Sequence, residues 1–422
     1  MWIPKPRNVL LAVLAVLGVI AAGLLIAQDQ ETLRVKTPLA ADDPRFPEYL
    51  SRLLGHRLSE GDAVTVHSDG ASAFEAMLTA IRGARHRVSF ETYIFGEGTV
   101  PDRFVEALAG AAQRGVDVRL VLDAMGAQAM NGEARERLRA AGARVAWFNP
   151  MSAYSLEEAN YRTHRKALVV DGEIAFVGGI GIADQWAQSI DGAPVWRDTH
   201  LELRGPVALD VEAAFNENWI ETGGVVAPDL LVHGAVPGGG ARSFALWSSP
   251  EGGANALKLL YLVAIGAARQ TLDIQSPYFI SDESTEWSLL DARRRGVRVR
   301  LLVEGEITDA AAVKYASRAL YGPLLEAGVE IYEYQPAMMH VKAMMIDASF
   351  SMAGSANFDN RSLELNDELN VVVFDPAVTA RLRSDFERDL RHSRRITLEA
   401  WQARPLYEKA RDRLWSLFGE VF

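Results

Sequence analysis

The chain of 422 residues contains no cysteine. It can therefore form no disulfide bond, no thiolate zinc site and no covalent intermediate on a cysteine. An excess of basic residues is also missing, because the formal net charge is −11. This charge disfavours a nucleic-acid-binding protein, although a local basic cleft stays compatible with an acidic total. The proportions of hydrophobic (49%) and charged (23%) residues are those of a globular protein and exclude a disordered chain.

Long hydrophobic runs are absent except for one near the N-terminus. Val9–Ala27 contains 19 residues without a charge, which is close to the roughly 20 that a helix needs to cross a membrane. No small-x-small cleavage site precedes Gln28, so we expect residues 1–28 to be an uncleaved anchor rather than a signal peptide. Two basic residues precede the run and two acidic residues follow it, namely Lys5, Arg7, Asp29 and Glu31. This predicts a cytoplasmic N-terminus and a body outside the cytoplasm, although Arg34 and Lys36 oppose that orientation.

The remaining chain shows one order of helix-like and strand-like patterns twice. A helix near Ala73–Ala84, the strand RVSFETYIF, a helix at Phe104–Gln113 and the alternating, half-buried strand VDVRLVLD form the first copy. Ala264–Arg269, TLDIQSPYFI, Leu289–Arg295 and VRVRLLVEG repeat it. AGARVAWFNP is likewise echoed by AGVEIYEYQP. Strands separated by helices predict an α/β fold with a largely parallel sheet in each copy.

The predicted organisation has six parts. They are the anchor at 1–28, a proline-containing linker at 29–60, a first half at 61–222, a glycine-rich inter-domain linker at 223–241, a second half at 242–398 and a C-terminal helix at 399–422. The apolar positions of that last segment have helical spacing, which suits docking on the membrane or packing on the body.

A short motif, His-x-Lys-x4-Asp, occurs once in each half. The copies are His164, Lys166 and Asp171, and His340, Lys342 and Asp347, and Gly178-Gly179 or Gly354-Ser355 follows each copy at the same offset. A histidine and a lysine two residues apart share one face of a strand. Alone, such a pair is usually a solvated strand edge, and lysine is a poor metal ligand, so we expect no metal site. The repetition with identical offsets favours a functional site instead.

These residues resemble the duplicated motif of the phospholipase D superfamily, and the closest likeness is to its bacterial cardiolipin synthase branch. The strings FETYIF, RGVDVRLVLDAMG, WRDTH, GSANFDNRS and DELNVVVFD also resemble that branch, over about residues 60 to 400. The resemblance implies two tandem phospholipase D-like α/β/α domains that share an active site at their interface. It also implies a bacterial inner-membrane enzyme that needs no cofactor.

The resemblance implies a phosphohistidine mechanism in which one histidine is the nucleophile and the other is the acid and base. We expect His164 to be the nucleophile and His340 the acid and base, although the near-symmetry of the two copies leaves the reverse assignment open. Phosphodiester cleavage needs a nucleophile, a proton donor and positive charge, and Lys166 and Lys342 supply the charge. Asp198 and Glu368, each just before a strand, are expected to orient the imidazoles, whereas Asp171 and Asp347 are expected to be supporting residues. The implied phosphate-binding residues are Asn357, Ser355 and Gly179. Gly181 stands where the family motif of the first half would have asparagine, so that position offers either a backbone N–H or no contact.

We expect a phosphatidyl transferase that makes cardiolipin and glycerol from two phosphatidylglycerol molecules at a membrane. Alternatives are a phospholipase D that forms phosphatidic acid, a metal-independent nuclease of the superfamily, which the acidic total disfavours, and a non-catalytic membrane scaffold. Several aromatic residues near predicted strand ends are candidates for the lining of a lipid cleft, although each is more often a core residue: Tyr93, Phe95, Trp196, Tyr278 and Phe279.

Overall fold

The computed structural model describes residues 32–150, 161–190, 192–226, 238–249 and 256–419. The predicted anchor and its hydrophobic run, 9–27, lie outside these residues. In the described ranges, every helix is too short or too polar to span a bilayer.

The first half contains seven strands and four helices in an alternating order that then changes to antiparallel strands. The strands are β1 (Ser59–His67), β2 (Arg87–Thr92), β3 (Asp117–Asp123), β4 (Arg144–Phe148), β5 (Lys166–Val170), β6 (Ile174–Gly178) and β7 (His200–Arg204). The helices are α3 (Gly70–Gly83), α4 (Thr99–Gln113), α5 (Gly132–Ala140) and α6 (Val207–Glu221), with a 3-10 turn at Asp184–Trp186.

The second half repeats this order and adds one strand. Its strands are β8 (Ala241–Ser248), β9 (Thr271–Gln275), β10 (Arg298–Val303), β11 (Glu330–Tyr334), β12 (Ala343–Ile346), β13 (Phe350–Gly354), β14 (Glu368–Phe374) and β15 (Ser393–Ile396). Its helices are α7 (Ala256–Ala267), α8 (Glu283–Arg294), α9 (Ala311–Ala319), α10 (Tyr321–Glu326), α11 (Asn360–Glu364) and α12 (Pro376–Leu390).

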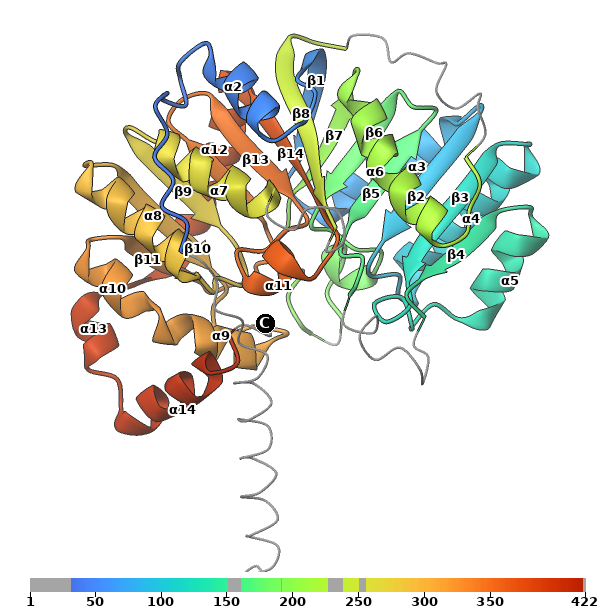
Figure 1. Cartoon of the computed structure of the whole chain (residues 1–422). Coiled ribbons are helices and arrows are strands. Elements are labelled where there is room, and N and C mark those ends of the chain that lie inside the picture. Colours follow the sequence, from blue (N-terminus) through green and yellow to red (C-terminus); the bar gives the residue numbers. More distant parts are fainter. Residues whose placement is uncertain (1–31, 151–160, 191, 227–237, 250–255, 420–422) are drawn as a thin grey trace, which may run out of the picture.

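The strands form one sheet whose order runs symmetrically outward from its centre. The order is β15-β11-β10-β9-β12-β13-β14-β8-β1-β7-β6-β5-β2-β3-β4, and the antiparallel pair β8–β1 joins the halves. Figure 1 shows these two strands between two lobes that lie side by side. Only β2-β3-β4 and β9-β10-β11 pair in parallel. The expected largely parallel sheet is therefore a mixed one, because short turns such as Asp171–Glu173 return the chain beside the strand it has just left.

Strand β3 is buried on both faces, which differs from the half-buried strand that its alternation predicts. Leu120 and Leu122 pack with α3 and α4 on one face. On the other face, Val121 packs against Phe215 and Trp219 of α6, and the Arg119 guanidinium lies 5.6 Å from the Phe215 ring centroid. The alternating pattern wrongly predicted a solvent-facing side for this strand. An arginine that is buried against aromatic rings cannot be told from an exposed arginine by sequence alone.

The segment predicted as a linker, 29–60, does not extend freely from the body. Within it, α2 (Phe46–Leu53) buries Phe46 and Leu50 in the core of the second half, and the Thr37 hydroxyl donates to the carbonyl of Val263 at 2.9 Å. Its apolar side chains are too few to form a conspicuous sequence pattern, but they complete a core formed by distant residues. At the other end of the chain, the predicted C-terminal helix is two helices, α13 (Leu398–Gln402) and α14 (Leu406–Ser416).

One helix of each half packs against the central strand of the other half. Helix α6 contacts β8, and α12 contacts β1. A shared core joins them, with Val211 and Ala214 of α6 and Leu382 and Phe386 of α12 in one cluster. This packing fixes the relative position of the halves, and hence of the two motif copies.

Candidate active site

Two backbone bridges join the halves directly beside the motif histidines. Thr163 pairs with Asp367, and the His164 N–H donates to the carbonyl of Asp367 at 2.9 Å. Met339 pairs with Arg197 in the same way, and the His340 N–H donates to the carbonyl of Arg197 at 2.7 Å. Each histidine of one half thereby lies next to the residue that precedes the predicted carboxylate of the other half.

The carboxylates consequently pair with the histidines across the interface. Glu368 Oε1 lies 3.0 Å from Nδ1 of His164, and Asp198 Oδ2 lies 2.8 Å from Nδ1 of His340. Sequence reasoning selected both carboxylates but did not assign them to particular histidines. Because Nδ1 of each ring faces a carboxylate, Nε2 is the nitrogen left for chemistry.

Each carboxylate has further donors that hold it in place. Glu368 accepts from the hydroxyl of Ser355, which in turn accepts from the Leu369 N–H at 2.9 Å. Asp198 accepts from the indole N–H of Trp186 at 3.1 Å and from the Thr199 N–H at 2.7 Å. The Ser355 hydroxyl therefore contacts Glu368, whereas the sequence predicted that it would contact the phosphate.

The Asp198 carboxylate occupies the space that the missing side chain of Gly179 leaves free. A Cβ atom at Gly179 would lie 2.4 Å from Oδ1 of Asp198, closer than any stable contact. Only glycine therefore permits this position of the carboxylate beside the chain.

Burial and charge set the protonation of both histidine–carboxylate pairs. Burial lowers the pKa of His164 to about 4, Glu368 opposes this, and the charges of Lys166 and Lys342 add to it. The pKa of His340 is also lowered by burial and by Lys342. Burial alone would raise the pKa of Glu368, but the interactions with His164, Lys166 and Ser355 together outweigh it and the net pKa is lowered. At neutral pH the resting site thus holds two neutral imidazoles and two ionised carboxylates.

The two motif lysines lie in the same electrostatic environment. Their ammonium groups donate to the carbonyls of His164 and His340, each at 2.7 Å. Burial lowers the pKa of Lys166 to about 7 and that of Lys342 to about 8, and the charge of Lys342 contributes to the lowering at Lys166. This mutual influence places both motif copies around one site.

The motif aspartates hold loop backbone and lie at the far ends of their strands. Asp171 accepts from the N–H groups of residues 85–87, and Asp347 accepts from those of residues 269–271. Both have positive φ, 54° and 46°, which asparagine and aspartate tolerate better than most residues. Lys166 is the first residue of β5 and Asp171 follows the last. Their backbone positions are therefore roughly 16 Å apart, at about 3.3 Å per residue.

The asparagine position of the motif differs between the halves. Asn357 is buried, and its Oδ1 has no hydrogen-bond partner among the described residues. At Gly181 there is no room for a side chain, because a Cβ atom would lie 2.8 Å from Cβ of Ile94 and 3.2 Å from Cη2 of Trp186. The site is thus polar on the Asn357 side and apolar on the Gly181 side.

The five aromatic candidates divide into core and site residues. Phe95 and Phe279 are fully buried in the two cores. Tyr93 lies edge-on to His164 at 5.2 Å between ring centroids, and Trp196 lies 5.7 Å from His340. Tyr278 is partly exposed and its hydroxyl donates to Asp309 at 2.5 Å.

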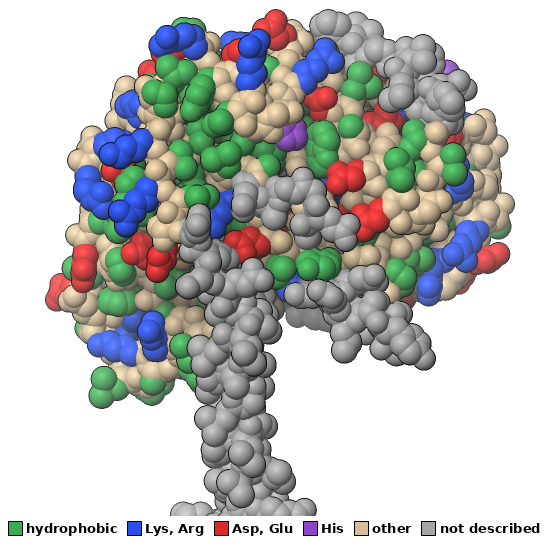
Figure 2. Space-filling model, in the orientation of Figure 1, with side chains coloured by type: hydrophobic (Ala, Val, Ile, Leu, Met, Phe, Trp, Pro, Cys, Tyr) green, Lys and Arg blue, Asp and Glu red, His purple; other side chains and the backbone are tan. Residues whose placement is uncertain are grey.

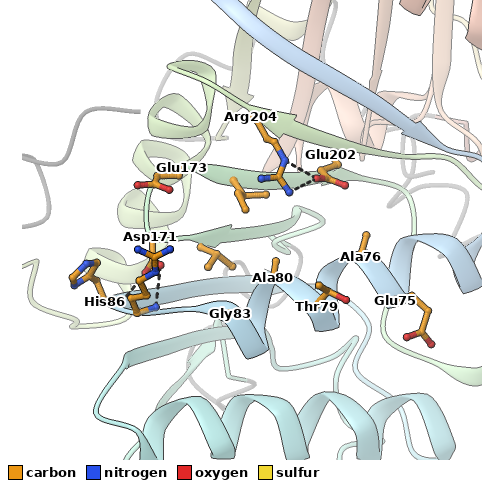
Figure 3. Close-up of a pocket in the computed structure, with 13 residues that line it drawn as sticks. Glu75, Ala76, Thr79, Ala80, Gly83, His86, Asp171, Glu173, Glu202 and Arg204 are labelled. Carbon is orange, nitrogen blue, oxygen red and sulfur yellow. Dashed lines mark hydrogen bonds and ion pairs between the residues drawn. The ribbon is translucent and has the colours of Figure 1, made fainter. Parts of the chain in front are cut away.

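A separate pocket of about 580 Å³ lies away from these residues, between α3 and strands β5 to β7. Figure 3 shows Asp171, His86, Glu202 and Arg204 around it, with Arg204 paired to Glu202. Since Asp171 is at the end of β5 opposite to Lys166, this pocket is not the candidate site.

The family model described as "Cardiolipin synthase, PLD-like domain" matches residues 77–219 and 261–390. The chain belongs to this family. It is thus a phospholipase D-type phosphatidyltransferase, and each matched segment carries one copy of the His-x-Lys-x4-Asp motif.

Characterised relatives match most of the chain. Cardiolipin synthase 1 of Bacillus anthracis is 30% identical over 401 residues, 92% of this chain and 78% of that protein. Cardiolipin synthase of Geobacillus thermodenitrificans is 32% identical over 393 residues, 91% of this chain and 77% of that protein.

A solved structure supports the fold. Phosphatidylserine synthase of Haemophilus influenzae superimposes with a TM-score of 0.66, at 15% identity, over 89% of this chain and 97% of that one. The tandem α/β halves are therefore the phospholipase D-like fold.

Two residues of this family member's site were missed by sequence reasoning. Trp186 holds Asp198 and lies 5.7 Å from the His340 ring centroid. Glu304 is a buried carboxylate that follows β10. Neither belongs to the repeated motif, so their spacing carried no signal.

Proposed function

We propose that the protein is a cardiolipin synthase that transfers a phosphatidyl group from one phosphatidylglycerol to the hydroxyl of another through a phosphohistidine. The observation that carries this proposal is the pair of crossed histidine–carboxylate contacts, His164 with Glu368 and His340 with Asp198, beside two buried lysines. Such a site can supply a nucleophile, an acid and positive charge at one phosphate.

In the first step, Nε2 of His164 attacks phosphorus while the bond to the glycerol oxygen breaks. His340 donates a proton to that oxygen, and Lys166 and Lys342 neutralise the phosphoryl oxygens. Although the resting pKa of His340 is lowered, the negative charge of a bound phosphodiester opposes this and favours its protonated form. In the second step, His340 takes the proton of the incoming hydroxyl, the new P–O bond forms and the P–N bond to His164 breaks.

The assignment of His164 as nucleophile rests on access. The His164 side chain is 12% exposed, whereas that of His340 is 5% exposed and lies beside the paired rings of Trp186 and Trp196. A bulky phosphodiester therefore reaches His164 more easily, and the walled imidazole of His340 suits the smaller alcohol.

Membrane association has support from one described surface. Helix α14 contacts α9 yet exposes Leu406, Tyr407, Leu414 and Leu417. Figure 2 shows hydrophobic side chains at the lower left, where Figure 1 places α14. We propose that this face contacts lipid while residues 9–27 anchor the chain in a bacterial inner membrane, with the body on the extracytoplasmic side.

A product assay tests the transfer. Purified protein with phosphatidylglycerol should yield cardiolipin and glycerol, whereas phosphatidic acid as the sole product would show hydrolysis instead. Cleavage of single-stranded DNA with EDTA present, without any lipid product, would assign the site to a nuclease.

A leaving-group experiment tests the roles of the histidines. With a phosphatidyl ester of p-nitrophenol, which leaves without a proton, His340→Ala should still form and accumulate the phosphoenzyme, and His164→Ala should form none. The opposite pattern would exchange the two roles.

A further inference from the structure

The chain offers an internal comparison at the carboxyl ends of β3 and β10. Asp123 is the last residue of β3, and Glu304 directly follows the last residue of β10. The two acids stand at matching positions of the two halves. Asp123 accepts from the N–H groups of Met125, Gly126 and Thr163, at 2.8, 2.9 and 3.2 Å. Its carboxylate thus holds the local loop.

Glu304 lacks every one of these backbone contacts. It is 2% exposed, and neither carboxylate oxygen meets hydrogen-bond geometry with a described residue, although the nearby Thr308 side chain lowers its pKa. A buried polar group without a good partner destabilises the folded protein, so its presence needs an explanation outside the fold. The loop role of Asp123 does not provide one.

Asp123 accepts from the N–H of the residue before His164, so the corresponding position of Glu304 in the second half is on the side of His340. The pKa of Glu304 responds to the charges of Lys342 and Asp309, and the Asp309 carboxylate in turn influences His340. Asp309 is exposed and accepts from the Tyr278 hydroxyl at 2.5 Å. The hydrogen-bonded pair of Tyr278 and Asp309 is therefore open to solvent, and its carboxylate acts electrostatically on both the buried Glu304 and His340.

The matching part of the first half is apolar. Ile94 and Trp186 occupy the space at Gly181, whereas the second half has Tyr278 near Asn357, whose Oδ1 is likewise without a partner among the described residues. The matching backbone bridges Phe95–Ile182 and Phe279–Phe358 place Tyr278 and Asn357 of the second half where the first half has Ile94 and Gly181, so the halves differ in polarity at this position.

We propose that Glu304, Asp309 and Tyr278 form a polyol subsite, which binds the free hydroxyls of the glycerol group that leaves or enters at His340. This inference rests on the proposed transfer function and specifies its alcohol. Burial raises the pKa of Glu304 to about 8, so at neutral pH it is mostly a neutral donor and acceptor, which suits hydroxyls better than an ammonium headgroup.

Competition between alcohols tests the subsite. The full chain, in detergent micelles with phosphatidylglycerol, receives equimolar labelled glycerol and ethanol, and the ratio of labelled phosphatidylglycerol to phosphatidylethanol is measured. Glu304→Met, which keeps the side-chain length but forms no hydrogen bond to a hydroxyl, should lower this ratio about tenfold, the effect of losing one good hydrogen bond. Glu306→Gln, at an exposed acid two residues further on, should leave the ratio unchanged.

The outcomes separate this inference from the proposed function. If the wild-type protein forms both products and Glu304→Met keeps the wild-type ratio, the subsite is refuted and the transfer function stands. In a parallel competition with ethanolamine in place of ethanol, a wild-type preference for ethanolamine over glycerol that Glu304→Met abolishes would assign the subsite to a cation and overturn the polyol proposal. A wild-type protein that forms no transfer product refutes both. As a second readout, the Tm of Glu304→Met should not fall, because an unpartnered buried carboxylate is removed; a fall of several degrees would indicate a structural role.

Discussion

Activity should decline from neutral towards alkaline pH, because the two lysines that hold the phosphate lose their protons unusually early. The site lowers the pKa of Lys166 from 10.5 to about 7 and that of Lys342 to about 8. For Lys166 this shift corresponds to about 5 kcal/mol against the ammonium form in the empty site, at about 1.4 kcal/mol per pH unit. The phosphodiester keeps its charge throughout this range, so the alkaline limb should report the two lysines together with His340, which must carry a proton to act as the acid and whose pKa is also lowered.

The expected magnitude follows from the pKa values. At pH 9 about one in a hundred Lys166 side chains is charged, so kcat/KM, which reports the free enzyme, should fall about a hundredfold from this lysine alone. On the acid side the limb should lie far lower, since His164 remains neutral down to a pKa of about 4.

The assay is kcat/KM for cardiolipin formation between pH 5 and 10, with circular dichroism at each pH as the control for folding. Lys166→Arg, whose guanidinium stays charged, should be slower, and its alkaline limb should be less steep by about one unit of log(kcat/KM) per pH unit, because one titrating group is removed. An alkaline limb that stays above pH 10 in the wild-type protein would refute the reasoning, as would an unchanged limb in Lys166→Arg.

Three further predictions concern the residues around the histidines. Glu368→Gln and Asp198→Asn should each lower kcat by roughly 10²–10⁴-fold with little change in Tm, because the matched amide can hold the wrong tautomer of its imidazole; single-turnover measurements check this, and a loss below tenfold would contradict it. Gly179→Ala should inactivate the protein by displacing Asp198, since its Cβ would lie 2.4 Å from Oδ1, whereas Gly110→Ala in α4, with its nearest neighbour at 3.8 Å, should retain activity. Asp347→Ala should lower the free energy of unfolding by about 1–3 kcal/mol because three backbone N–H groups lose their acceptor, and denaturant titration should show this; an unchanged midpoint would rule out the supporting role.

The duplicated motif allowed the sequence to predict which side chains meet, but not how they pair. Identical offsets in two halves indicated that His164 and His340 face one site. The charge of Lys342 lowers the pKa of Lys166, which agrees with a single site. The pairing of His164 with Glu368 depends on the bridge between Thr163 and Asp367, a contact between residues 204 positions apart. No local periodicity encodes such a contact.

The residues outside the repeat were the hardest to predict. Phe46 and Leu50 belong to a segment with a linker-like composition, yet they fill a core that other parts of the chain build. Trp186 and Glu304 act through their surroundings, because an indole N–H or a carboxylate gains its role only from the partners that the fold provides or withholds. Sequence patterns alone therefore show neither the distant core that Phe46 and Leu50 complete nor the partners that surround Trp186 and Glu304.

The crossed contacts make the two halves mutually dependent. Each histidine relies on a carboxylate that the opposite half supplies, at 3.0 and 2.8 Å. A fragment that ends after α6 would carry His164 and Lys166 but not Glu368, and the remaining fragment would carry His340 without Asp198. Neither duplicated copy is therefore free to drift in sequence while the other preserves the activity, and two separately inactive fragments should regain function only when they reassemble along β1 and β8.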